Sequence, residues 1–308
     1  MNMKQFNLLL AGFLLLASSC TAQTKNYISF GSVQELRDFL NRKTPGYPLI
    51  SAHRGGPMKG FPENCIATFE NATSYQPVVI EFDVTLSKDS VLVIMHDDKL
   101  DRTSNGTGFI RDYTYAELQK LHLKDNFGTL TSYKIPTLTE VLKWGKGKVL
   151  FTIDVKRGVP FSKIIEQVRK TQSESNSIVI TYNDNQAVEV HKLAPDLMIS
   201  VSAKYSNDLE RLKSKGVPYD RMVAFVGTGG FDQKGFWALH QREISCIMGT
   251  MGNLDRRAMT RKNIKYYYMY ANSGADMIST DNLIMAGKEL NQYRKDKKIS
   301  SVHVKKIK

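Results

Sequence analysis

Short apolar runs alternate with longer stretches of helical spacing along most of the chain. Runs rich in β-branched residues indicate strands, and each is followed by a segment whose apolar residues recur with the period of a helix. The expected strands are residues 47–53, 78–84, 148–155, 177–182, 197–202, 222–226, 244–249 and 276–281. The expected helices are residues 64–74, 138–144, 161–171, 185–193, 207–215, 233–240, 257–273 and 283–294. Eight such pairs predict an α/β protein with a (β/α)8 TIM barrel.

One interval breaks this alternation. Residues 91–96 form a further strand-like run, and about forty residues with turns at Gly106 and Gly108 follow it. We therefore expect a small insertion after the second strand, at about residues 97–136. Insertions at this rim of a barrel commonly shape access to the site.

Length and composition fit one globular barrel. The chain has 308 residues, of which 42% are hydrophobic and 24% charged, as in ordinary globular proteins. We expect an N-terminal segment at residues 23–46, the barrel at 47–294 and a basic C-terminal tail at 295–308. Two smaller domains are the alternative.

Residues 1–22 have the layout of an export signal. Lys4 precedes an apolar run from Leu8 to Leu16, and small residues follow. That run is too short to cross a bilayer core of roughly 30 Å. Residues 17–20, ASSC, resemble a relaxed lipobox, so we expect an envelope lipoprotein lipidated at Cys20. The alternative is cleavage after Ala22, which would give a soluble protein exported to the periplasm or secreted.

The other two cysteines, Cys65 and Cys246, fall in different strand-end regions. We expect two buried free thiols, because a disulfide would require the fold to bring these regions close together. The cysteine spacing matches no zinc motif.

The net charge of +13 is concentrated near the C-terminus, where residues 288–308 contain eight Lys or Arg residues. A solvated face is the simplest interpretation, and attraction to anionic lipids or phosphorylated substrates is the alternative. Nucleic acid is not expected as a partner, because no aromatic-basic motif accompanies the charge.

Three carboxylates lie on neighbouring expected strands. Glu81 and Asp83 are two residues apart, so both side chains point to one face of the strand. Asp154 and Lys156 repeat this spacing on the next barrel strand. The carboxylates would offer hard oxygen ligands to one divalent cation, Mg²⁺ or Ca²⁺. An internal salt-bridge network with Lys156 and Arg54 is the alternative.

Two histidines end β-rich runs and would project into the same cavity. His53 and His96 could serve as general acid and base, and Arg54 offers a forked donor for phosphate oxygens. Together with a metal these groups favour metal-assisted phosphodiester cleavage. The remaining histidines are interpreted as structural: His122, His191, His240 and His303.

Four blocks of the sequence resemble the glycerophosphodiester phosphodiesterase family. They read HRGGPMKGFPENCIATFENA, VVIEFDVTLSKDSVLVIMHDDKLDRTSNGTG, LFTIDVK and GADMISTD, and the similarity runs from about Leu49 to Asp281. The resemblance implies a barrel with an insertion after the second strand and a divalent metal. It also implies a small-molecule substrate, a glycerophosphodiester that is hydrolysed to glycerol 3-phosphate and an alcohol.

The resemblance also implies residue roles. His53 and His96 would be the acid-base pair, and Arg54 and Lys156 would bind the substrate phosphate. The metal ligands would be Glu81, Asp83 and Asp154, with Glu63 close to the metal and Asn64 ordering its loop.

The chain departs from the usual family pattern in several places. Asp154 stands where family members usually have Glu, PENT reads PENC, and TKDG reads SKDS. The tryptophan-containing motif usual before the last strand is not found. These changes leave the preferred alcohol open.

Other questions also stay open at the level of sequence. The sequence does not decide which of His53 and His96 is the acid and which is the base. It also does not decide whether the nucleophile is water or a substrate hydroxyl, and the oligomeric state is unknown. Two other functions remain: a phospholipase of the C or sphingomyelinase D type acting on intact lipid, and a non-catalytic binding lipoprotein of the envelope.

Overall fold

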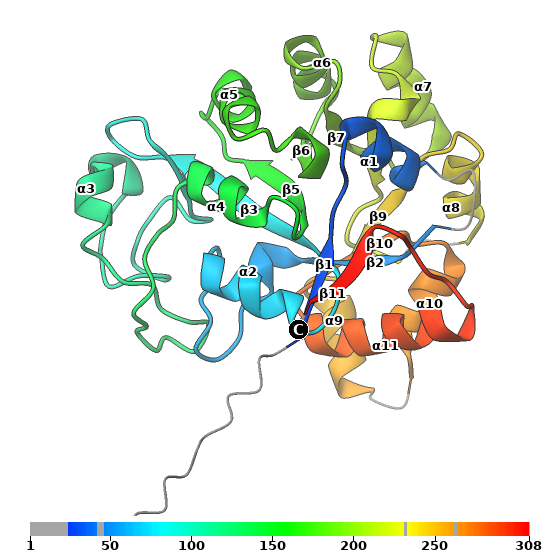
Figure 1. Ribbon diagram of the computed structural model, residues 1–308. Helices are drawn as coiled ribbons and strands as arrows, with labels where there is room; N and C mark the ends of the chain where they lie inside the picture. Colours follow the sequence, from blue (N-terminus) through cyan, green and yellow to red (C-terminus); the bar gives the residue numbers. More distant parts are fainter. Residues whose placement is uncertain (1–23, 42–45, 231–232, 262–263, 308) are drawn as a thin grey trace, which may run out of the picture.

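The computed structural model describes residues 24–41, 46–230, 233–261 and 264–307, and the structural findings below concern these ranges. Within them, parallel strands close into a barrel of eight (Figure 1). The ring closes because β2 pairs with both β10 and β3. The (β/α)8 TIM barrel is therefore confirmed. Its strands are β2 (Leu49–Ala52), β3 (Val78–Leu86), β5 (Leu150–Val155), β6 (Ser177–Ile180), β7 (Met198–Ser202), β8 (Met222–Phe225), β9 (Cys246–Gly249) and β10 (Met277–Thr280).

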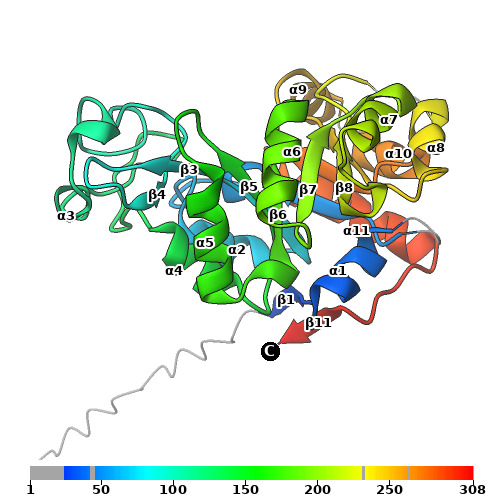
Figure 2. The same ribbon diagram turned by 90° about the horizontal axis from the view of Figure 1, so that it is seen from above.

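Helices cover the outside of the barrel, as Figures 1 and 2 show. Each buries an apolar stripe against the strands; in α5, Ile164, Ile165 and Val168 are buried. The start of α4 is fixed by a capping box between Thr137 and Glu140. The helices that follow barrel strands are α2 (Ile66–Thr73), α4 (Leu138–Gly145), α5 (Phe161–Thr171), α6 (Asp184–Leu193), α7 (Ser206–Ser214), α8 (Gln233–His240), α9 (Asn253–Thr260), α10 (Tyr266–Ser273) and α11 (Leu283–Asp296).

The single helix expected at residues 257–273 is wrong, because two helices, α9 and α10, occupy this region. The Glu289 carboxylate accepts hydrogen bonds from the backbone N–H groups of Tyr267 and Tyr268 at 2.8 and 3.2 Å. These N–H groups belong to the first turn of α10, where a helix has no internal partners for them. Glu289 of α11 therefore stabilises the start of α10, a second helix within the expected range 257–273.

The insertion expected after the second strand is present and has its own small core. It begins with β4 (Leu92–Ile94), which pairs antiparallel with the end of β3, and it contains α3 (Tyr115–Leu118). Figure 2 shows the insertion at one side of the barrel. Its buried apolar residues, with Cys65 from the loop before α2, form a cluster separate from the main core: Val93, Met95, Leu100, Ile110, Leu118, Leu123 and Ile135.

The barrel interior changes from apolar to polar along its axis. At the N-terminal ends of the strands, the inward layer is apolar: Leu49, Val79, Leu150, Ile178, Met198, Val223, Ile247 and Met277. Two residues further on, β2, β5, β7 and β10 contribute small hydroxyl side chains, and β3 contributes Glu81. These hydroxyl residues are buried: Ser51, Thr152, Ser200 and Ser279. The next inward positions, at the C-terminal ends, form the mouth of the barrel, where barrel enzymes carry their sites.

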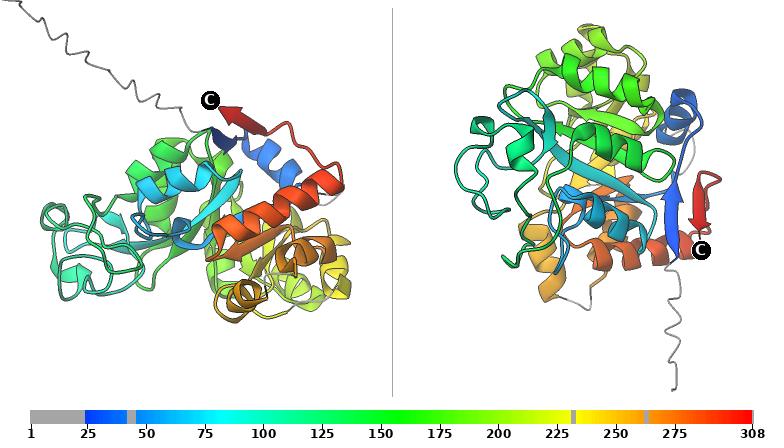
Figure 3. Two further views of the ribbon diagram at one scale, coloured as in Figure 1. Left: turned by 90° about the horizontal axis from the view of Figure 1, so that it is seen from below. Right: turned by 60° about the vertical axis from the view of Figure 1, so that its left-hand side comes forward.

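Both ends of the described chain pack on the barrel floor. The strands β1 (Lys25–Ile28) and β11 (Val304–Ile307) pair antiparallel, and α1 (Val33–Leu40) lies beside them (Figure 3). Ile28, Leu36 and Leu40 are buried against the apolar layer at the strand starts. The floor is therefore closed, and the chain enters the barrel at the end opposite its mouth.

Several sequence predictions concern residues outside these ranges. The export signal at residues 1–22 and the lipid site at Cys20 lie among residues that the structure does not describe. In the described part, no helix has the length and apolar character needed to cross a membrane. Cys65 and Cys246 are buried and no disulfide joins them, as expected.

Candidate active site

The three predicted metal-binding carboxylates meet at the mouth of the barrel. Because β3 and β5 pair in parallel, Asp83 lies beside Asp154, and Glu81 lies one step deeper beside Thr152. All three carboxylate residues are buried. They line a cavity of about 220 Å³ together with His53, His96 and Lys156, among others.

The electrostatics of these carboxylates fit a cation site. Glu81, Asp83 and Asp154 each place one oxygen within 4.8 Å of the others. Burial, reinforced by the charge of Asp83, raises the pKa of Glu81, and burial also raises the pKa of Asp154. Burial favours the same change at Asp83, but the Lys156 ammonium outweighs it and lowers the pKa of Asp83. A divalent cation would relieve this repulsion, and an all-oxygen donor set suits Mg²⁺ or Ca²⁺.

Lys156 and Asn64 hold the carboxylates in place. Lys156 Nζ lies 2.6 Å from Asp83 Oδ1 and 3.0 Å from Asp154 Oδ2. The Asn64 amide donates to Asp83 Oδ2 at 2.8 Å, and its oxygen accepts from the Asp83 backbone N–H at 3.1 Å. Asn64 has a φ of 56°, in the left-handed region, where Asn is better tolerated than most residues. The loop expected around Asn64 is thus tied directly to the cluster.

Tyr182, at the end of β6, contacts Asp154. Its hydroxyl donates to Asp154 Oδ1 at 2.9 Å. Burial and the neighbouring carboxylate hold the pKa of Tyr182 well above its usual range, so the hydroxyl stays a donor. No sequence pattern predicts this contact, because Tyr182 is one of several aromatic residues in the chain and lies just after a strand.

His53 is oriented by Asp281. Its Nδ1 lies 2.7 Å from Asp281 Oδ1, which leaves Nε2 as the ring nitrogen available to the cavity. Burial alone would lower the pKa of His53, but the bond to Asp281 and the charge of Glu81 raise it. Asp281 is itself held by buried Asp255, whose carboxylate accepts from the Asp281 backbone N–H at 2.9 Å. Asp281 ends the GADMISTD block of the sequence, but the sequence pattern predicts no role for it.

His96 is oriented by residues of the insertion, as His53 is oriented by Asp281. Its Nδ1 lies 2.6 Å from Asp97 Oδ1, and Arg102 binds both oxygens of Asp97 at 2.6 and 2.9 Å. The hydrogen bonds from Arg102 contribute most to holding the pKa of Asp97 well below its usual range. Arg102 also binds both oxygens of Glu63 at 2.7 and 2.8 Å. The insertion is thereby joined to the loop that contains Glu63.

Arg54 lies beside the carboxylates and contacts Glu81, Glu63 and Asp83. Its backbone N–H donates to Glu81 Oε2 at 2.7 Å, and its Nη1 donates to Glu63 Oε1 at 3.1 Å. Its Nε is buried, finds no hydrogen-bond partner among the described residues and lies 3.8 Å from Asp83 Oδ2. Glu63 pairs with two arginines and is not a member of the three-carboxylate group. Arg54 therefore lies against Glu63 and the carboxylate cluster, and it is not among the residues that line the cavity.

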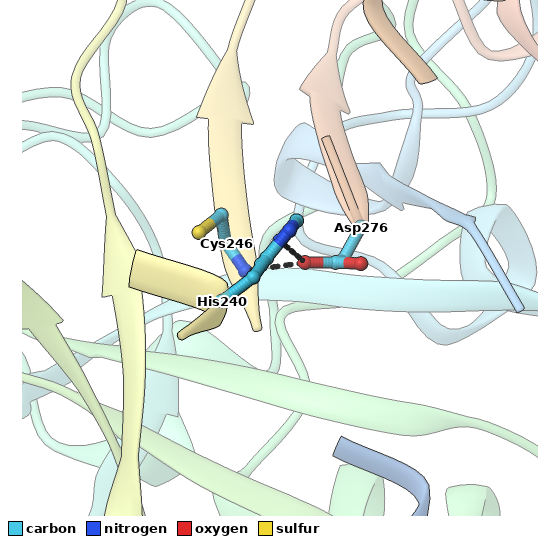
Figure 4. A group of neighbouring side chains, drawn as sticks. All are labelled: His240, Cys246 and Asp276. Atoms are coloured by element: carbon cyan, nitrogen blue, oxygen red, sulfur yellow. Dashed lines mark hydrogen bonds and ion pairs between the residues drawn. The ribbon is translucent and has the colours of Figure 1, made fainter. Parts of the chain in front are cut away.

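A second group of metal-type side chains lies at the floor end of the barrel (Figure 4). His240 Nε2 lies 2.9 Å from Asp276 Oδ2, and the Cys246 backbone N–H donates to the same oxygen at 2.8 Å. Figure 4 shows the Cys246 sulfur pointing away from the carboxylate. Asp276 therefore ties the end of α8 to the start of β9, which agrees with the structural role expected for His240.

Comparison with known proteins places this geometry in a family. The profile of the Glycerophosphoryl diester phosphodiesterase family matches residues 53–238. A glycerophosphodiester phosphodiesterase of Caldanaerobacter subterraneus is 38% identical over 160 residues, which cover 50% of this chain and 65% of that protein. One from Bacillus altitudinis is 35% identical over 162 residues, covering 49% and 65%. The matches thus span just under two thirds of both relatives.

A solved structure matches nearly the whole chain. The crystal structure of a glycerophosphoryl diester phosphodiesterase from Parabacteroides distasonis superposes with a TM-score of 0.84 at 32% identity. The match covers 92% of this chain and all of that one. The profile match alone extends over more than half of the 308 residues. The chain belongs to the glycerophosphoryl diester phosphodiesterase family.

Proposed function

We propose that the protein hydrolyses glycerophosphodiesters to glycerol 3-phosphate and an alcohol. One observation carries the proposal: three buried carboxylates at the barrel mouth line the same cavity as two histidines whose Nδ1 atoms are each fixed by an aspartate. Membership of the family supports the same reaction. The cation required would be one Mg²⁺ or Ca²⁺, held by Glu81, Asp83 and Asp154, and it would stabilise negative charge on the phosphoryl oxygens.

Side chains of the protein would bind the phosphate and transfer the protons. The guanidinium of Arg54 and the ammonium of Lys156 would bind the nonbridging phosphate oxygens as charge builds up on them. His53 and His96 would present Nε2 from two sides of the cavity. One removes the proton from the attacking hydroxyl, and the other protonates the departing alkoxide. The attacking group is water, or a substrate hydroxyl followed by water.

The experiment that tests this function is release of glycerol 3-phosphate from glycerophosphoethanolamine by the purified mature protein. We expect no release in EDTA and recovery when Mg²⁺ or Ca²⁺ is restored, because the carboxylate cluster would then be filled. The metal that restores the larger kcat/KM identifies the preferred ion. Failure of both ions to support turnover would contradict the proposal and favour the binding lipoprotein or a phospholipase.

We further propose that the protein is exported and anchored to the envelope through lipidated Cys20. The support is the ASSC block after a short apolar run. We expect the wild-type protein to partition into the membrane fraction and into detergent, whereas Cys20→Ala should move it to the soluble fraction. An unmodified N-terminus beginning at Gln23, measured by mass spectrometry on the wild type, would instead establish cleavage after Ala22.

A further inference from the structure

The two-stranded sheet on the barrel floor has an outer side that no other described element covers. Figure 3 shows β1 and β11 side by side at this end of the molecule. Every second residue of β1 is buried against the barrel, so the residues between them point outward. The register pairs Lys25 with Ile307 and Tyr27 with Lys305. These four side chains therefore share the outer side of the sheet.

Lysine side chains predominate on this side. Lys305 is exposed, and Lys148 lies next to β1, with its Nζ 5.8 Å from the centre of the Tyr27 ring. A single carboxylate, that of Glu70, pairs with both Lys25 and Lys148, at 3.3 and 3.7 Å. Three lysines against one carboxylate leave positive charge on the outer side of the sheet.

The segments that form the floor carry the same sign of charge. Residues 24–41 and 295–307 contain seven Lys or Arg residues against three Asp or Glu residues, a net charge of +4. The end of α11 belongs to the floor, because Arg294 donates to the carbonyl of Pro48, directly before β2. The exposed cations of the second segment are Lys295, Lys297, Lys298, Lys305 and Lys306. We call the floor surface around β1 and β11 the basic face; its residues are Lys25, Tyr27, Lys148, Lys305, Lys306 and Ile307.

Exposed apolar side chains lie among these lysines. Val302, in the turn before β11, is 87% exposed, and Ile307 is 44% exposed. Tyr27 adds an amphipathic ring of the kind found at membrane–water interfaces. Lysines can keep their charges at the level of lipid phosphates while such side chains enter the head-group layer. This combination suits the surface of an anionic bilayer better than a small soluble ligand.

The sequence places the basic face close to the expected lipid anchor. Cys20 precedes Lys25 by five residues, and five residues of extended chain span at most about 17 Å. A lipid on Cys20 would therefore keep the basic face close to the bilayer. Contact between the two would then be intramolecular, so even a weak attraction would be effective.

We propose that the basic face docks on an anionic membrane surface. The lysine ammonium groups pair with lipid phosphates, and Val302 and Ile307 lie at the level of the head groups. The inference extends the proposed anchor at Cys20 but does not require it, because the attraction belongs to the folded floor. It is also independent of phosphodiester hydrolysis, whose site lies at the other end of the strands.

The first test measures binding of the mature protein without lipid, residues 23–308, to vesicles by sedimentation. We expect binding to phosphatidylglycerol-containing vesicles and none to pure phosphatidylcholine, with the binding lost as salt screens the charges. Replacing both exposed lysines of β11, in Lys305→Gln/Lys306→Gln, should lower the partition coefficient by about twentyfold, because each lysine near an anionic surface contributes about fivefold. The matched control is Lys88→Gln/Lys120→Gln, which removes two exposed lysines from the insertion side of the barrel.

A second test locates the contact. Cys65 and Cys246 are buried, so a thiol-reactive, polarity-sensitive dye would label an introduced cysteine at the surface. We expect the emission of dye on Val302→Cys to shift to the blue when anionic vesicles are added. Dye on Phe127→Cys should show no shift, because Phe127 is 71% exposed on the insertion and would stay in water.

The outcomes distinguish this proposal from the others. Absence of binding to anionic vesicles at low salt, equal losses in the two double variants, or a blue shift at position 127 alone would each overturn the assignment of the basic face. Melting temperatures check that the variants are folded. Release of glycerol 3-phosphate, measured without vesicles, should be the same in wild type and Lys305→Gln/Lys306→Gln, so its absence in both would count against the proposed function and leave the docking result standing.

Discussion

Replacing His96 with alanine is expected to lower kcat by about 10²–10⁴-fold, the usual contribution of a general acid or base. His96 lines the cavity with the three carboxylates, and Asp97 fixes its Nδ1. Among the described residues, His53 is the other histidine lining that cavity, and it is already engaged by Asp281 on the opposite side. No third histidine of the described chain lines the cavity to take over the proton transfer. The measurement is steady-state kinetics on glycerophosphoethanolamine with saturating metal.

The matched control is His122→Ala. His122 lies in the same insertion but does not line the cavity, so kcat should stay within about twofold of wild type, as for surface substitutions in general. Thermal melting of both variants checks that the insertion remains folded. A His96→Ala enzyme with nearly wild-type kcat and an unchanged melting temperature would show that His96 takes no part in proton transfer.

Glu81→Gln is expected to abolish metal-dependent turnover while stabilising the metal-free protein. The substitution keeps the size of the side chain but removes one charged ligand from the cluster. Burial and the charge of Asp83 raise the pKa of Glu81 above its ordinary value of 4.5. A raised pKa in the folded state means that its stabilising contribution is present below pH 4.5 and is lost as pH rises through the folded value. Gln escapes that loss, so its advantage in EDTA should grow with pH.

The measurement is the melting temperature from pH 5 to 9, in EDTA and with saturating Mg²⁺ or Ca²⁺. Metal should raise the melting temperature of wild type, because it binds the folded state, and should leave Glu81→Gln nearly unchanged. Glu189→Gln, at an exposed position on α6, is the matched loss of one carboxylate and should behave as wild type. Equal stabilisation of Glu81→Gln and wild type by metal would rule out Glu81 as a ligand.

The barrel strands were predictable because they are buried on both faces. Runs such as VVIEF and KVLFTI are almost continuously apolar, which is typical of parallel strands covered by helices. In contrast, β1 and β11 were missed, since each is four residues long and pairs only with the other end of the chain, Lys25 with Ile307. Helix α1 was missed for the same reason: what stabilises it is the distant apolar layer of the floor.

The site residues were predictable as far as strand geometry determines them. The two-residue spacing of Glu81 and Asp83 determines the face on which both lie, and the parallel pairing of β3 with β5 places Asp154 beside Asp83. The partners were not predictable. Asp281 and Tyr182 reach the site from distant parts of the chain, and Arg102, although close to Asp97 in sequence, also pairs with Glu63, 39 residues away. No local sequence pattern predicts these contacts, because they depend on where the fold places the last strand, β6 and the insertion.

The closed floor determines which way the molecule would face when anchored. Lys25, the first residue of β1, lies at the floor, and the carboxylate cluster lies at the opposite end of the strands. With Cys20 in a bilayer, as proposed, the body of the barrel would stand between that bilayer and the catalytic cavity. Substrate would then arrive by diffusion through the aqueous compartment, and the anchored enzyme would spare the lipids of the membrane that holds it.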